Sequence, residues 1–267
     1  MKRVVLILLS CLMLVLAGCD AADELPTGSQ SASSGITEGP SGSPSDVIDI
    51  QSITFTSEHE TTMYAYLEDC SYMIFSQTMT NGVAGQGVYT TTRYSFSINV
   101  KQQVQSQIMR YVVVNGAEID GVGYSLYSDG INTIASEDGV WVKAGAKYEM
   151  QVWDLSRFST DADVYRYLLH DLKLPIGVVG ESNAGWWTFE VIEAAPASLI
   201  VGIDYDELLD ASYKYTFRDR DGMILPDSVS VRVDYIVEGV QYYIESVIQI
   251  NSIGNTEIIM PKVGDKA

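Results

Sequence analysis

Residues 213–250 read YKYTFRDRDGMILPDSVSVRVDYIVEGVQYYIESVIQI and set the architecture of the chain. Apolar and polar residues alternate through this stretch, most regularly over 229–237 and 242–250, which is the period-two pattern of half-buried strands. Turn residues separate the alternating runs, first Asp219-Arg220-Asp221-Gly222 and then Glu238-Gly239. Successive strands joined by tight turns predict an antiparallel meander.

Earlier parts of the chain repeat the pattern. Further β-rich runs occupy 94–100, 107–114, 121–128, 140–143, 186–192 and 198–203. Turn pairs such as Asp138-Gly139 separate several of these runs. Between the last two groups of strands, Asp206 to Ala211 is interpreted as a short helical connection. We therefore expect a mainly β domain with minor α, built on one antiparallel sheet.

Two segments have helical periodicity. Apolar residues recur at helical spacing over 160–172, where Thr160-Asp161-Ala162-Asp163 resembles a capping box and Pro175 closes the segment. A weaker pattern over 57–70 predicts a second helix, although its Thr and Tyr content also suits a strand. The sequence thus supplies one or two helices to cover the sheet.

The N-terminus has the layout of a bacterial export signal. Met1-Lys2-Arg3 is positive, and the apolar run from Val4 to Leu16 is too short to span a bilayer as a helix of roughly 20 residues. Leu16-Ala17-Gly18-Cys19 resembles the lipobox of bacterial lipoproteins. The resemblance implies that residues 1–18 are a signal peptide and that Cys19 carries a lipid, which places the protein at the outer face of the cell membrane.

A flexible tether is expected after the anchor. Residues 19–46 are rich in Ser, Gly, Pro and acids and cannot bury enough apolar area to offset the entropy of ordering. A chain of this length has an r.m.s. span of roughly 29 Å. The remaining residues, 47–267, predict a single β-rich extracytoplasmic domain, in which Cys70 is expected to be a buried core residue.

Charge and composition exclude several classes of function. The formal net charge of −19 argues against nucleic-acid binding, which needs a basic face. Loss of residues 1–18 would remove two basic residues and no acid, taking the charge to −21. Residues 180–185 resemble a hydrolase nucleophile elbow but carry one residue too many, and no helical pattern follows. With only two His and three Cys, we expect no catalytic residues, no metal and no cofactor.

The apolar segment after the 160–172 helix is the candidate ligand site. Pro175 and Gly177 interrupt it, so it is either a buried connection or a mobile flap over the sheet. An apolar space enclosed between flap and sheet would suit a small hydrophobic ligand, whereas plain core packing is the alternative for each residue. The candidate ligand-binding residues are Leu168, Leu172, Leu174, Ile176, Val178, Val179, Trp186, Trp187 and Phe189.

These features together resemble the LolA-like lipoproteins, including the LppX–LprG group. The resemblance covers roughly residues 60–262 and includes three local features: residues 138–143, the hairpin at 219–222, and Ile258-Ile259-Met260-Pro261 near the C-terminus. It implies an incurved antiparallel sheet, or half-barrel, with helices closing a hydrophobic cavity. Members of the family bind lipid or acylated molecules and help to move them from the membrane.

Two functions remain open from the sequence. The first is a membrane-anchored lipoprotein that binds or carries a lipid or another hydrophobic molecule, with the monomer as the default state. The second is a non-enzymatic cell-envelope module that binds protein or cell-wall polymer through a Tyr-rich sheet face. The candidates for that face are Tyr64, Tyr66, Tyr89, Tyr94, Tyr242 and Tyr243. An open apolar cavity favours the first function, and a filled interior with an aromatic outer stripe favours the second.

Overall fold

The computed structural model describes most of the chain after the expected tether. The described residues are 52–149, 152–169, 172–183, 185–191, 205–220 and 222–267. The expected signal peptide, Cys19, the tether and the strand predicted over 198–203 lie outside them. No helix among the described residues is long and apolar enough to cross a membrane.

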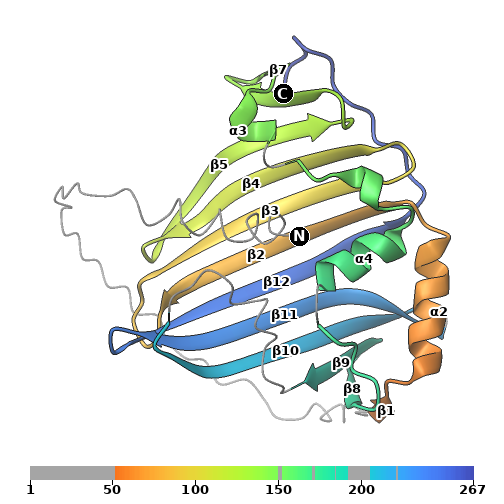
Figure 1. Ribbon diagram of the computed structural model, residues 1–267, viewed down its shortest axis with the longest axis vertical. Helices are drawn as coiled ribbons and strands as arrows, with labels where there is room; N and C mark the ends of the chain where they lie inside the picture. The colour runs from red at the N-terminus through yellow and green to blue at the C-terminus, as the bar shows by residue number, and fades with distance from the viewer. Residues whose placement is uncertain (1–51, 150–151, 170–171, 184, 192–204, 221) are drawn as a thin grey trace, which may run out of the picture. The chain divides into compact units, whose positions relative to one another are not determined.

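Within the described residues, twelve strands form one antiparallel sheet in the order β1-β8-β9-β10-β11-β12-β2-β3-β4-β5-β6-β7 (Figure 1). The strands are β1 (Ser52–Thr54), β2 (Tyr72–Val83), β3 (Tyr89–Asn99), β4 (Val104–Val114), β5 (Ala117–Ser128), β6 (Thr133–Glu137), β7 (Val140–Lys143), β8 (Val179–Asn183), β9 (Trp186–Val191), β10 (Glu207–Arg220), β11 (Met223–Val237) and β12 (Val240–Gly254). The sheet is curved, and β1 and β7 end it on opposite sides without pairing to each other. This confirms the expected mainly β, incurved antiparallel sheet.

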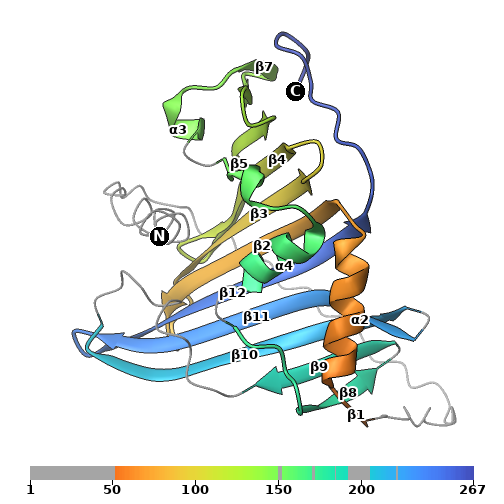
Figure 2. The same ribbon diagram turned by 45° about the vertical axis from the view of Figure 1, so that its right-hand side comes forward.

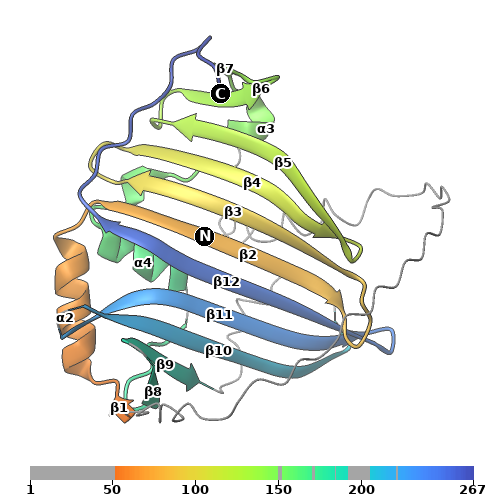
Figure 3. The same cartoon turned by 180° about the vertical axis from the view of Figure 1, so that it is seen from behind.

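The described helices lie at the concave face and at one end of the strands (Figure 2). Their bounds are α2 (Ser57–Glu68), α3 (Ala146–Glu149), a 3-10 helix (Leu155–Arg157) and α4 (Asp161–Leu169). No described helix covers the convex face, as the view from behind shows (Figure 3). Helix α2 runs along the strand ends, packs on β11 and α4, and buries Met63 and Leu67 completely.

The two strongest turn predictions are confirmed by backbone geometry. Glu238 and Gly239 have φ of 51° and 77° between the paired Val237 and Val240, as a two-residue hairpin requires. Gly222 has φ of 83° and its amide donates to the Asp219 side chain at 2.9 Å. The long meander β10–β11–β12 is therefore held in register by local turn chemistry.

Both predicted helices form, and each has a side-chain cap. At α2, Thr56 and His59 make a reciprocal capping box. At α4, the Asp163 carboxylate accepts the amides of Ser159 at 2.8 Å and Thr160 at 3.3 Å. These bonds satisfy amides that lack partners inside the helix, and the negative charge suits the helix N-terminus.

The interpretation of Asp206 to Ala211 as a helical connection is wrong, because β10 begins at Glu207. A register shift lies between Leu208 and Asp210, where the strand departs from regular pairing with β11. Two leucines, Leu208 and Leu209, follow each other here and break the period-two pattern in the sequence. The strand accommodates them at the irregularity. The segment extends the meander rather than connecting elements.

The C-terminal residues protect one edge of the sheet. Trp141 of β7 donates its amide to Asp265 at 3.0 Å and accepts from Gly264 at 2.8 Å, while Ala267 donates to Gly139 at 2.9 Å. An exposed strand edge is a template for unwanted pairing, so these bonds satisfy backbone groups that would otherwise be open. The last residues of the chain are thus part of the fold.

Candidate functional site

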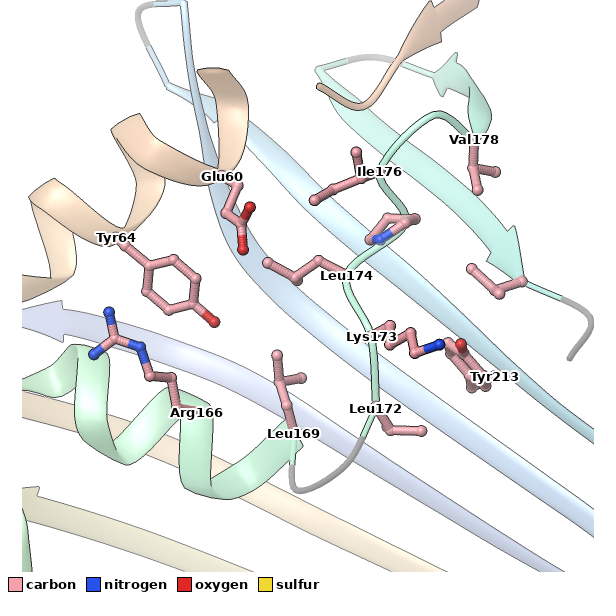
Figure 4. A pocket seen from close by; sticks show the side chains of 12 residues that line it. Glu60, Tyr64, Arg166, Leu169, Leu172, Lys173, Leu174, Ile176, Val178 and Tyr213 are labelled. Carbon is pink, nitrogen blue, oxygen red and sulfur yellow. The ribbon is translucent and has the colours of Figure 1, made fainter. Parts of the chain in front are cut away.

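A pocket of about 500 Å³ lies between α2, α4, the segment 172–178 and the β9–β10 region of the sheet (Figure 4). Its walls are Glu60 and Tyr64 of α2, Arg166 and Leu169 of α4, Leu172, Lys173, Leu174, Pro175, Ile176 and Val178 of the connecting segment, and Val191 and Tyr213 of the sheet. The volume falls in the range of roughly 300–1,000 Å³ that small-molecule sites occupy.

Backbone hydrogen bonds fix the connecting segment against the rest of the fold. The Gly177 amide donates to the Phe55 carbonyl at 2.8 Å, and the Phe55 amide donates to Val178 at 3.0 Å. Gly177 has φ of 83°, and the Val178 amide closes a four-residue turn on Pro175 at 3.0 Å. The segment is therefore a pinned turn, which resolves the choice between a connection and a loose flap.

A further hydrogen bond ties the segment to the sheet. The hydroxyl of Tyr215, which is fully buried, donates to the Lys173 carbonyl at 2.9 Å. Burial and the neighbouring Tyr213 raise the pKa of Tyr215, so this hydroxyl stays protonated and remains a donor. This hydrogen bond satisfies the Lys173 carbonyl, which lies outside any strand and so has no partner from sheet pairing.

The floor of the pocket is apolar. Leu169 and Leu172 are buried at its base, and Val191 and Tyr213 contribute buried side chains from the sheet. Ile176 differs from these residues, because it lines the pocket and is also 49% exposed. The pinned turn therefore forms a rim that faces both the pocket and the solvent.

Polar side chains gather on the helical side of the pocket. The Arg166 guanidinium lies 4.4 Å from the ring centroid of Tyr64 and pairs with Asp163 at 3.3 Å and Glu68 at 3.4 Å. These pairs are half-exposed and contribute little to stability, but they orient the guanidinium at the mouth. Burial raises the pKa of Tyr64, and Arg166 opposes that shift. The hydroxyl of Tyr64 is thus a neutral hydrogen-bonding group (Figure 4).

The structure brings together part of the predicted ligand set. Leu172, Leu174, Ile176 and Val178 share the pocket. The others lie outside its lining, and a ligand role for them stays a prediction: Leu168, Val179, Trp186, Trp187 and Phe189. The contributions of α2 were not foreseen, although an acid and a tyrosine four residues apart share one helical face.

Two of the predicted residues outside the pocket, Phe189 and Trp186, pack against other side chains instead. Phe189 is fully buried and contacts Phe55 and Phe217 at centroid distances of 5.5 and 5.7 Å. The guanidinium carbon of Arg218 lies 4.7 Å from the ring centroid of Trp186. Hydrophobic sequence alone does not distinguish such core or surface stacking from a ligand wall.

The tyrosines proposed for an interaction face do not lie on one face. Tyr64 and Tyr66 are on α2, whereas Tyr94 is buried at 5% exposure. Tyr242 and Tyr243 are successive residues of β12, so they point to opposite sides of the sheet. The structure provides no single tyrosine stripe from these residues.

Asp161 and Tyr165 are ionisable residues of α4 outside the pocket lining that are buried without a well-formed side-chain hydrogen bond. Asp161, the first residue of α4, is 0% exposed, and the Tyr72 backbone approaches its carboxylate. Burial raises the pKa of this carboxyl from 3.8 to about 7, against the opposing influence of the Tyr72 backbone and Lys101. The free thiol of Cys70 is also buried as expected, and burial and Asp161 raise its pKa.

The described residues contain no group of three or more His, Cys, Asp or Glu that could hold a metal ion. No protein-family model matches the chain, and no curated protein is similar to it in sequence.

Solved structures with a similar arrangement come from bacteria. LprF from Mycobacterium bovis has a TM-score of 0.40 at 8% identity, with 79% of this chain and 99% of that chain covered. The lipoprotein LppX from Mycobacterium tuberculosis has a TM-score of 0.35 at 13% identity, covering 78% and 97%. A LolA superfamily protein from Nitrosomonas europaea has a TM-score of 0.31 at 8% identity, covering 78% and 96%.

Proposed function

We propose that this chain is a bacterial lipoprotein that holds a lipid or another hydrophobic molecule in the pocket between α2, α4 and β10. The observation that carries the proposal is the pocket itself, whose buried floor is formed by Leu169, Leu172, Val191 and Tyr213. Such a surface gains about 0.8 kcal/mol for each CH₂ group that leaves water. The role is binding and carriage, without catalysis.

The distribution of polarity supports an amphiphile over a uniformly apolar ligand. The floor is apolar, whereas Glu60, Tyr64 and Arg166 lie on the α2–α4 side and Lys173 on the connecting segment. An acyl chain on the floor would leave its polar end among hydrogen-bonding side chains at the mouth. A few placed polar groups on an apolar wall are the usual means of orienting a ligand.

Export and anchoring complete the proposal. The lipobox at Cys19 would place a covalent lipid at the outer face of the cell membrane, and the tether would let the domain work beside the bilayer. Binding of a membrane-derived amphiphile needs this proximity. Cys19 is therefore proposed as the lipidation site and the membrane as the source of ligand.

Native mass spectrometry of the lipidated chain, extracted from membranes, tests the pocket. We expect wild-type protein to retain an added mass in the range of a lipid. Leu174→Trp places a large ring in the pocket and should lose that added mass, whereas Leu209→Trp, at a 42% exposed position of β10, should keep it. Equal retention by the two variants, with unchanged unfolding midpoints, would show that the ligand lies elsewhere. Wild-type protein without added mass would refute carriage.

A further inference from the structure

The rim of the pocket carries exposed apolar side chains beside β1, the first described strand. Ile176 is 49% exposed at the second position of the Pro175–Val178 turn, and Val179, at the start of β8, is 64% exposed. Single exposed aliphatic residues are normal on a protein surface, so it is the position of these two beside the pocket, and not their exposure alone, that points to contact with another apolar phase. The hydrogen bonds to Phe55 hold this turn in place, so it is a preformed feature.

The position of the chain's N-terminal side indicates that this apolar phase is the membrane. β1 is the first described strand, and its residue Thr54 pairs directly with Val179. Figures 1 and 2 show β1 and β8 together at one corner of the sheet. The 32 residues between Cys19 and Ser52, the first residue of β1, would give a flexible tether an r.m.s. span of roughly 31 Å, so a lipid on Cys19 would let this corner reach the bilayer.

We propose that the turn at Ile176 and Val179 is a bilayer-contacting tip through which the ligand passes between the membrane and the pocket. The inference rests on the proposed function, because it assigns the entrance of the same site. Ile176 lines the pocket and faces outward, so an acyl chain can move along it without exposing its full length to water. Two aliphatic side chains bind a bilayer weakly by themselves.

The covalent anchor makes weak contact sufficient. Tethering converts the contact into an intramolecular event at a high effective concentration, so the tip has only to orient the pocket. The lipidated chain, without residues 1–18, would carry a net charge of −21, which favours an uncharged or zwitterionic surface over an anionic one. The partner we assign is therefore a bilayer surface such as phosphatidylcholine.

The depth of the tip can be measured directly. The lipidated chain is reconstituted in phosphatidylcholine vesicles after Ile176→Cys or Val263→Cys and labelling with an environment-sensitive fluorophore. Cys70 is 5% exposed and should not react. Val263, 64% exposed, precedes Gly264, whose amide donates to Trp141 of β7 at the opposite edge of the sheet from β1, and serves as the control. We expect a blue shift and quenching by lipid-attached quenchers at 176 only. Equal signals at both positions, or none at 176, would overturn the inference.

Transfer of a pyrene-labelled fatty acid from the vesicles tests the entrance. We expect the double variant Ile176→Ser with Val179→Ser to lower the uptake rate about tenfold while final occupancy falls less than twofold. Ile131→Ser, at a 91% exposed position between β5 and β6, should change neither quantity. An unchanged rate in the double variant contradicts the tip. Failure of wild-type protein to take up the probe at any time refutes the proposed function instead, and the depth measurement still decides whether the tip meets the bilayer.

Discussion

Replacing Asp161 by Asn should make the protein more stable at alkaline pH and leave its stability unchanged below pH 3.8. The carboxyl is 0% exposed, and its two oxygens lack a well-formed hydrogen bond. Lys101 and the Tyr72 backbone oppose the effect of burial, but the pKa still rises from 3.8 to about 7. Folding therefore favours the protonated form of this group.

The sign and size of the effect follow from linkage. Between pH 3.8 and about 7 the folded chain holds a proton on Asp161 that the unfolded chain has released, so stability falls as pH rises through this window. The shift corresponds to a penalty of about 4 kcal/mol above pH 7. The dipole of α4 favours the ionised form by about 0.3–1 kcal/mol, so we expect a net penalty of about 3 kcal/mol.

Urea unfolding of the wild-type chain and the variants at pH 5 and pH 8.5, followed by tryptophan fluorescence, measures this penalty. Asp161→Asn should exceed the wild type by about 1–2 kcal/mol at pH 5, where part of the penalty is already present, and by about 3 kcal/mol at pH 8.5. Asp138→Asn is the matched control, because Asp138 is exposed at φ of 49°, a conformation that Asn also tolerates. If Asp161→Asn were less stable than wild type at pH 8.5, the buried carboxylate would have to be ionised and stabilised, and the reasoning would fail.

Three substitutions test the packing around the pocket by the same unfolding assay. Gly180→Ala should destabilise the fold by about 1–3 kcal/mol, because an added Cβ would lie 2.5 Å from the Phe189 ring; an unchanged midpoint would mean that the ring moves freely. Tyr215→Phe should cost about 1 kcal/mol through loss of the bond to Lys173, and no loss would show that water satisfies that carbonyl equally well. Phe55→Ala should cost about 3–5 kcal/mol, since the ring is fully buried, and a cost below 1 kcal/mol would contradict its central place in the core.

The sheet was predictable where one face is apolar and the other polar. Buried and less buried residues alternate along part of β11, as expected for a strand with one face on the core, whereas β12 is half-buried along most of its length. β2 was not recognised, although it lies in the middle of the sheet between β12 and β3. Its Gln77 and Asn81 pair with Ile248 and Ile244, so polar residues occupy the face that is apolar in β12. Hydrogen bonding from both neighbours, rather than alternation, holds this strand in place.

Only the part of the pocket formed by consecutive residues could be predicted from the sequence. Pro175 and Gly177 mark a segment that cannot be helix or regular strand, and local rules suffice to place its apolar residues together. The opposing wall comes from Tyr64, about a hundred residues earlier, and no local pattern connects the two. Phe189 was expected to contact a ligand, but it packs in the core against Phe55 and Phe217. Both neighbours come from distant parts of the sequence, so no local pattern could predict this packing.

Helix α4 connects the buried carboxyl to the pocket. Asp161 begins the helix, while Arg166 and Leu169 at its other end form part of the pocket wall. The nine residues from Asp161 to Leu169 span about 12 Å of helix. Because a helix this short moves as one rigid piece, a change in how its first turn packs is transmitted to the wall. Folding stability should therefore fall between pH 3.8 and about 7, and ligand binding should weaken as the folded carboxyl ionises above about pH 7. Asp161→Asn should remove both pH dependences together. Binding that still weakened with pH in this variant would show that the pocket responds through its own side chains rather than through α4.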